Sequence, residues 1–143
     1  LVVVLWNRMF VELPAILQRP GLLWVERLDT VVAPWITSEI EHHDLHHEVF
    51  HLVGDPEGVD PFEASRSLLV ELLAGGVEAG EFQVPDVALT AEFLLFAYAG
   101  PCHHQTQDVA EVIPGVQELF RRTVVAPDGA TGMKSGGMLP QRP

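Results

Sequence analysis

The sequence predicts an all-α domain of about six helices, and two observations carry this prediction. Apolar residues recur at helical spacing between proline and glycine residues, and no segment shows sustained alternation of apolar and polar residues. Helix start and stop signals also divide the chain into segments of helical length. With 143 residues, 48% of them hydrophobic, the chain is long enough to bury one core.

Proline and capping residues set most of the expected boundaries. Pro14 should kink the first helix or end its regular part, and the second helix should stop before Pro34. Ser38 to Glu41 forms a capping box that starts the third helix, although Pro34 is an alternative start. The six expected helices cover about residues 1–18, 22–32, 38–53, 60–79, 85–99 and 108–125.

The last three helices have the clearest start and stop signals. Asp60 and Asp108 are expected N-caps, and Gly80 is expected to end the fourth helix because glycine adopts the left-handed conformation without a Cβ penalty. Pro114 lies inside the sixth helix, which therefore either kinks there or begins there. Residues 1–125 are expected to form one domain, and residues 126–143 a disordered tail.

The charge of the chain argues against nucleic-acid binding. Eight Lys and Arg residues against twenty Asp and Glu residues give a formal net charge of −12. Such a chain is repelled by phosphates, so we expect that it does not bind DNA by itself. Arg121 and Arg122 are the one adjacent basic pair, and they are expected to stabilise the negative end of the last helix.

Composition also indicates a cytoplasmic protein with no membrane partner. Cys102 is the single cysteine, which excludes an intramolecular disulfide and fits a reducing compartment. The most apolar window, Val87 to Cys102, is interrupted by Glu92 and is shorter than the roughly 20 residues of a membrane span. The chain starts at Leu1 within an apolar pattern, so we expect a piece of a longer polypeptide.

Histidines are concentrated on the expected third helix. His43 and His47 are four residues apart, a spacing at which two imidazoles can chelate a divalent metal. The alternative is a solvated or pocket-lining face, and no cofactor is predicted. The carboxylates of Glu39, Glu41, Asp44 and Glu48 are expected to be a solvated face, and the possible third metal ligands are Glu39, Asp44, His103 and His104.

A small-molecule pocket is a second expectation for this helix. An excess of aromatic and imidazole groups on inward faces is typical of a pocket for a planar or mildly polar ligand, although a helix packed between a core and a neighbour would look similar. The pocket is expected between the first three helices and the fourth and fifth. Its expected lining residues are Trp6, Phe10, Trp35, His43, His47, Phe50 and Phe93.

The fifth and sixth helices are the expected dimer interface. The run from Phe93 to Ala99 has no polar face, so a helix there must be buried on two sides. A second copy would supply the outer side in a four-helix C2 interface; a central core helix in a monomer is the alternative. The expected interface residues are Phe93, Phe96, Val112, Val116, Leu119 and Phe120.

Nothing in the sequence indicates an enzyme. The chain contains no G-x-S-x-G, P-loop or G-x-G-x-x-G motif. Cys102 is followed by His103 and His104, but residues adjacent in sequence seldom form a catalytic pair. No catalytic residue is therefore predicted.

Two segments resemble the regulatory domain of the tetracycline-repressor (TetR/AcrR) family of transcription factors. Leu69 to Leu89 resembles a hinge of that domain, with a leucine-rich helix, a Gly-Glu-Phe turn at Gly80 and a helix opened by Pro85 and Asp86. Val116 to Arg122 is similar to the end of the last helix in many members.

The resemblance implies an effector-binding and dimerisation domain of a repressor. Its partners would be a second copy and a small, largely apolar effector, and DNA would be bound only through an N-terminal helix-turn-helix that this sequence lacks. The alternative function is a free-standing α-helical metal- or cofactor-binding protein that uses His43 and His47.

Overall fold

The computed structural model describes residues 11–50, 60–97 and 108–127. These residues form six α-helices and no strand, so the all-α prediction is confirmed for the part of the chain that is described. The helices are α2 (Leu13–Leu17), α3 (Trp24–Glu41), α4 (His43–Phe50), α5 (Glu63–Glu78), α6 (Val87–Ala97) and α8 (Val109–Val124).

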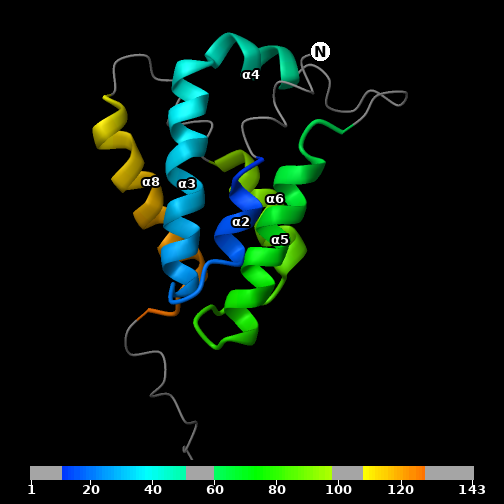
Figure 1. The fold of residues 1–143 in the computed structure, drawn as a ribbon, viewed down its shortest axis with the longest axis vertical. Helices are drawn as coiled ribbons and strands as arrows, with labels where there is room; N and C mark the ends of the chain where they lie inside the picture. The colour runs from blue at the N-terminus through cyan, green and yellow to red at the C-terminus, as the bar shows by residue number, and fades with distance from the viewer. Residues whose placement is uncertain (1–10, 51–59, 98–107, 128–143) are drawn as a thin grey trace, which may run out of the picture.

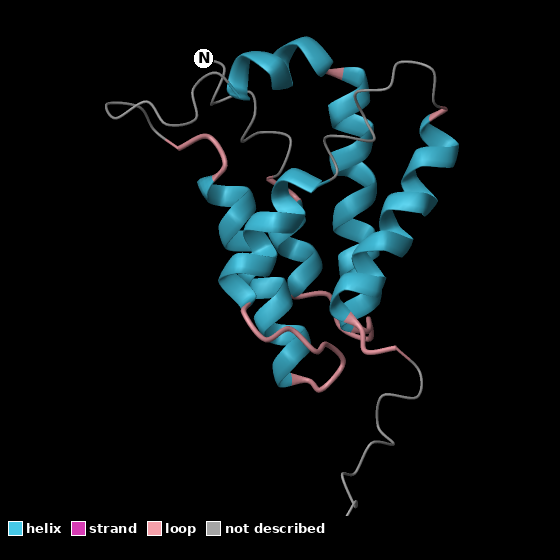
Figure 2. Cartoon of the chain, turned by 180° about the vertical axis from the view of Figure 1, so that it is seen from behind, coloured by secondary structure: helices cyan, strands magenta, loops and turns pink. Residues whose placement is uncertain are grey.

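The long helix α3 organises the arrangement. Helix α8 packs along one side of α3, while α5 and α2 contact it as well and α6 packs along α5 (Figures 1 and 2). Helix α4 lies across the C-terminal end of α3 (Figure 1). One apolar core joins α2, α3, α5, α6 and α8. It includes Leu28, Val31, Val32, Trp35, Ile36, Leu69, Leu72, Leu73, Leu94, Leu95, Val112, Val116, Phe120 and Val124.

The predicted stop at Pro34 is wrong, because α3 continues through this residue to Glu41. Proline inside a helix costs about 3 kcal/mol, whereas burying one large apolar side chain contributes about 1.5–3 kcal/mol. Val32, Trp35 and Ile36 flank the proline and are at most 1% exposed. Their burial outweighs the cost, and the expected N-cap Ser38 becomes a buried residue inside the helix.

Other helix boundaries differ less from the predicted ones. Residues 11 and 12 form a turn, and α2 begins at Leu13 with Pro14 in its first turn, where proline is tolerated. The rest of the expected first helix lies outside the described residues. Helix α8 begins at Val109 and contains Pro114, so the later start is excluded. The expected N-cap Asp108 is confirmed by its side chain, which accepts a 3.1 Å hydrogen bond from the Ala110 N–H.

The expected turn after α5 is confirmed in detail. Gly80 has a φ of 77°, in the left-handed region that favours glycine. The carbonyl oxygen of Gly76 accepts hydrogen bonds from the N–H groups of Glu81 and Phe82, at 2.9 and 3.0 Å. Phe82 is 3% exposed, and its ring lies against Gly76, where a Cβ would meet the ring at 2.0 Å.

This turn also connects α5 to α3 and α8. The Glu81 carboxylate accepts hydrogen bonds from the N–H groups of Trp24, at 2.9 and 3.1 Å, and of Val25, at 3.5 Å. It therefore satisfies amides at the N-terminus of α3, which have no partner within their own helix. The Gln83 N–H donates to the Val124 carbonyl at 2.8 Å, at the end of α8.

Two helical glycines offer a matched test of this packing. Gly76→Ala should destabilise the domain by about 1–3 kcal/mol, because the added methyl group would displace the buried Phe82 ring. Gly115→Ala makes the same change in α8, where a Cβ meets nothing within 4 Å, and should stabilise by about 0.5–1 kcal/mol. Urea denaturation followed by circular dichroism measures both. Equal effects of the two substitutions would contradict the packing described.

Candidate functional site

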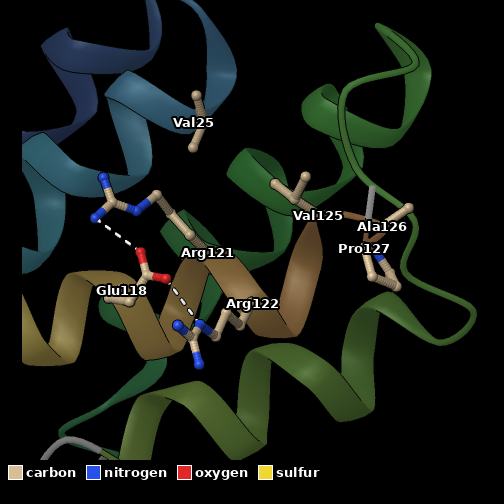
Figure 3. Close-up of a pocket in the computed structure, with 7 residues that line it drawn as sticks. All are labelled: Val25, Glu118, Arg121, Arg122, Val125, Ala126 and Pro127. Carbon is tan, nitrogen blue, oxygen red and sulfur yellow. Dashed lines mark hydrogen bonds and ion pairs between the residues drawn. The ribbon is translucent and has the colours of Figure 1, made fainter. Parts of the chain in front are cut away.

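A groove lies between the N-terminal end of α3 and the C-terminal end of α8 (Figure 3). Its volume is about 550 Å³, within the range of roughly 300–1,000 Å³ that small-molecule sites occupy. One part of its lining is apolar and the other carries charge. The lining residues are Val25, Glu118, Arg121, Arg122, Val125, Ala126 and Pro127.

The charged part is an ion-pair cluster centred on Glu118. Arg122 Nε lies 2.7 Å from Glu118 Oε1, and Arg121 Nη2 lies 3.2 Å from Glu118 Oε2. Arg121 Nη1 reaches across to α3, where it lies 3.0 Å from Asp29 Oδ2. The spacing of Glu118 from the two arginines, three and four residues, places all three on one helical face.

Both carboxylates have shifted pKa values, for different reasons. The hydrogen bond from Arg122, aided by the positive charge of Arg121, holds the pKa of Glu118 below its ordinary value. Burial raises the pKa of Asp29, and the attraction of Arg121 opposes that rise without cancelling it. Both arginines lie in the last turn of α8, as the sequence analysis expected.

A second, smaller hollow surrounds the junction of α3 and α4. It has a volume of about 340 Å³ and is lined by Ile40, Glu41, His42, His43, Asp44 and Leu45. The expected single helix through the histidines is wrong, because α3 ends at Glu41 and α4 begins at His43. His42 ends α3 with φ −121° and ψ 37°, outside the helical region, and its side chain is exposed.

The break between α3 and α4 separates His42 from the histidines of α4. His43 and His47 keep their i, i+4 spacing on α4, where His43 is half-buried and His47 is exposed. Among the residues that the structure describes, no group of three His, Cys, Asp or Glu side chains could hold a metal ion. Of the possible third ligands, His103 and His104 lie outside the described residues.

The acidic residues near this junction were expected to be solvated together, and one of them is not. Glu39 is completely buried on α3, whereas Glu41, Asp44 and Glu48 are exposed. The expectation is therefore wrong for Glu39. It failed because α3 extends past Pro34 and places Glu39 on the side that faces the core.

The residues of the expected pocket lie in different surroundings. Trp35 is 1% exposed and belongs to the core, whereas Phe93 on α6 is 60% exposed, so the structure does not bring these two together in an interior cavity. Trp6, Phe10 and the side chain of Phe50 lie outside what the structure describes.

The expected interface residues also separate into two groups. Val112, Val116 and Phe120 are buried in the core of the chain itself, since α8 packs along α3. Phe96 is half-buried. Its ring contacts the Phe62 ring edge-on, with the two ring centroids 5.3 Å apart. Phe93 and Leu119 remain exposed, at 60% and 59%.

Two features of the surface were not predicted from the sequence. Leu89 is 67% exposed one helical turn before Phe93, and the i, i+4 spacing of this apolar pair could have indicated a second apolar face. The groove itself was missed because its walls come from α3 and α8, which are far apart in sequence. Only the Glu118-x-x-Arg121-Arg122 spacing was visible as a signal.

Comparison of the chain with protein-family models, with curated proteins and with solved structures found no match. None of the described helices is both long enough and apolar enough to cross a membrane.

The ion pair in the groove predicts a measurable titration. Glu118 should titrate below the ordinary glutamate pKa of 4.5, and Arg122→Gln should raise its pKa toward that value. Because the folded-state pKa is lowered, any stabilisation from this pair is present above pH 4.5 and is lost as the pH falls through the lowered value. Carboxyl-detected NMR measures the titration. Arg19→Gln, which removes an exposed arginine outside the groove lining, should leave Glu118 unchanged.

Proposed function

We propose that the chain is the effector-binding and dimerisation domain of a TetR/AcrR-like transcriptional regulator. The observation that carries the proposal is the turn from α5 to α6. Gly80, Glu81 and Phe82 each have a distinct structural role there, in the segment on which the resemblance rests. An all-α bundle in which this turn joins two packed helices is the arrangement that the resemblance implies.

Dimerisation would use the outer faces of α6 and α8. Leu89 and Phe93 form an exposed apolar pair on α6, and Leu119 is exposed on α8. An exposed pair of large apolar side chains on one helical face, such as the pair on α6, is a candidate interaction site. The buried residues Val112, Val116 and Phe120 would act indirectly, by holding α8 against α3 so that Leu119 faces outward.

Regulation would follow from coupling between an effector and DNA-binding heads. With a net charge of −12, this domain would leave the DNA contact to a separate basic helix-turn-helix domain of the regulator. The effector would be small and largely apolar, as the resemblance implies. No catalytic step is part of the proposal.

Two exposed positions allow association to be tested separately from folding. Phe93→Asp and Leu119→Asp should each raise the dimer dissociation constant by about two orders of magnitude, because a buried unpaired charge costs several kcal/mol. Light scattering coupled to gel filtration should give twice the 15.7 kDa chain mass for the wild type and a lower mass for the variants. Circular dichroism should show that both variants stay folded.

Val11→Asp is the matched control, because Val11 is 69% exposed and precedes α2. It should remain dimeric. A wild-type chain that is monomeric at micromolar concentration, or α6 and α8 variants that associate as well as this control, would refute the proposed interface.

A further inference from the structure

The groove between α3 and α8 contains two arginines in a chain that is otherwise strongly acidic. Arg121 and Arg122 face the single carboxylate of Glu118 within the lining, in a chain whose formal net charge is −12 (Figure 3). Both oxygens of Glu118 are occupied by the two arginines. The two arginines thus offset much of the charge of Glu118. The groove still has unused hydrogen-bonding capacity on the donor side.

Arg122 carries that capacity. It contacts Glu118 through Nε, and its terminal amino groups have no partner among the described residues. Its side chain is 75% exposed, so a ligand can reach those groups. A guanidinium presents its donors in a planar fork that matches a carboxylate, and such charge-assisted pairs are stronger than neutral hydrogen bonds. Arg121 lacks this freedom because it already binds both Asp29 and Glu118.

The other part of the lining suits an apolar chain or ring. Val25 from α3 and Val125, Ala126 and Pro127 after α8 supply aliphatic surface beside the arginines. Val125 is 38% exposed, so part of this surface is open to a ligand. Covering it would remove apolar area from water, which favours binding at roughly 25 cal/mol per Å².

From this juxtaposition we propose that the groove binds an amphipathic monocarboxylate. The carboxylate pairs with the terminal amino groups of Arg122, and the apolar part lies over Val25, Val125 and Pro127. A monoanion is favoured over a dianion, because the second charge would approach the neighbouring Glu118 carboxylate. This site does not depend on the proposed regulatory function, and it lies apart from the α3–α4 junction.

Octanoate is a suitable probe, with octan-1-ol as the uncharged analogue of the same chain length. Calorimetric or NMR titration of the full chain at pH 7 and low salt should detect octanoate binding that is at least fivefold tighter than octan-1-ol binding. Arg122→Gln should weaken octanoate binding by about fivefold, the upper end of what an exposed charge pair contributes, because Arg122 is exposed. Arg122→Lys keeps the positive charge but lacks the planar fork of donors. Its octanoate affinity should lie between those of the wild type and Arg122→Gln.

Arg19→Gln makes the same charge change outside the groove and should bind octanoate like the wild type. Val125→Ser tests the apolar wall and should weaken octanoate while leaving acetate, which has no tail, unaffected. Equal octanoate affinities of the Arg122 and Arg19 variants, or equal binding of octanoate and octan-1-ol, would overturn the proposal. These outcomes are independent of whether the chain dimerises, so they do not bear on the regulatory proposal.

Discussion

The backbone amides at the N-terminus of α3 need hydrogen-bond acceptors from outside the helix, and the arrangement of the other helices depends on this constraint. A helix start leaves its first N–H groups without backbone partners, and here Glu81 supplies the acceptor from more than fifty residues away in sequence. Glu81, in the turn that follows α5, therefore also fixes the start of α3. Trp24 packs against Gly75, where a Cβ would lie 2.1 Å from the indole ring, so side-chain packing reinforces the same connection.

The groove and the proposed interface both follow from that connection. The turn holds the start of α3 through Glu81 and the end of α8 through the bond from Gln83 to Val124, so Val25 and Val125 line one groove. Burial of Val112, Val116 and Phe120 then holds α8 along α3, which leaves Leu119 facing outward. In the proposed regulator, one turn between α5 and α6 positions surfaces on both α6 and α8.

Local signals were predictable from the sequence, and long-range ones were not. Asp108 and Gly80 act within a few residues of themselves, so the prediction of a cap and a turn was confirmed. Pro34 was misinterpreted because its effect depends on the apolar stripe that it interrupts, and burial of that stripe outweighs the local preference. Glu81 and the groove could not be predicted, since each requires segments separated by more than fifty residues to meet. The expected interface residues on α8 differ in exposure for the same reason. Val112, Val116 and Phe120 pack in the core against α3, and only Leu119 of this expected set on α8 is exposed to a partner.

Amide hydrogen exchange at Trp24 tests the role of Glu81 most directly. Glu81→Ala removes the acceptor, so the Trp24 N–H should lose protection, and the domain should lose about 1–2 kcal/mol of stability. Glu78→Ala is the matched control, because Glu78 is exposed in the last turn of α5 and should leave Trp24 protected. Unchanged exchange at Trp24 in the Glu81 variant, or an equal loss of protection in the Glu78 control, would contradict the claim that this carboxylate fixes the start of α3.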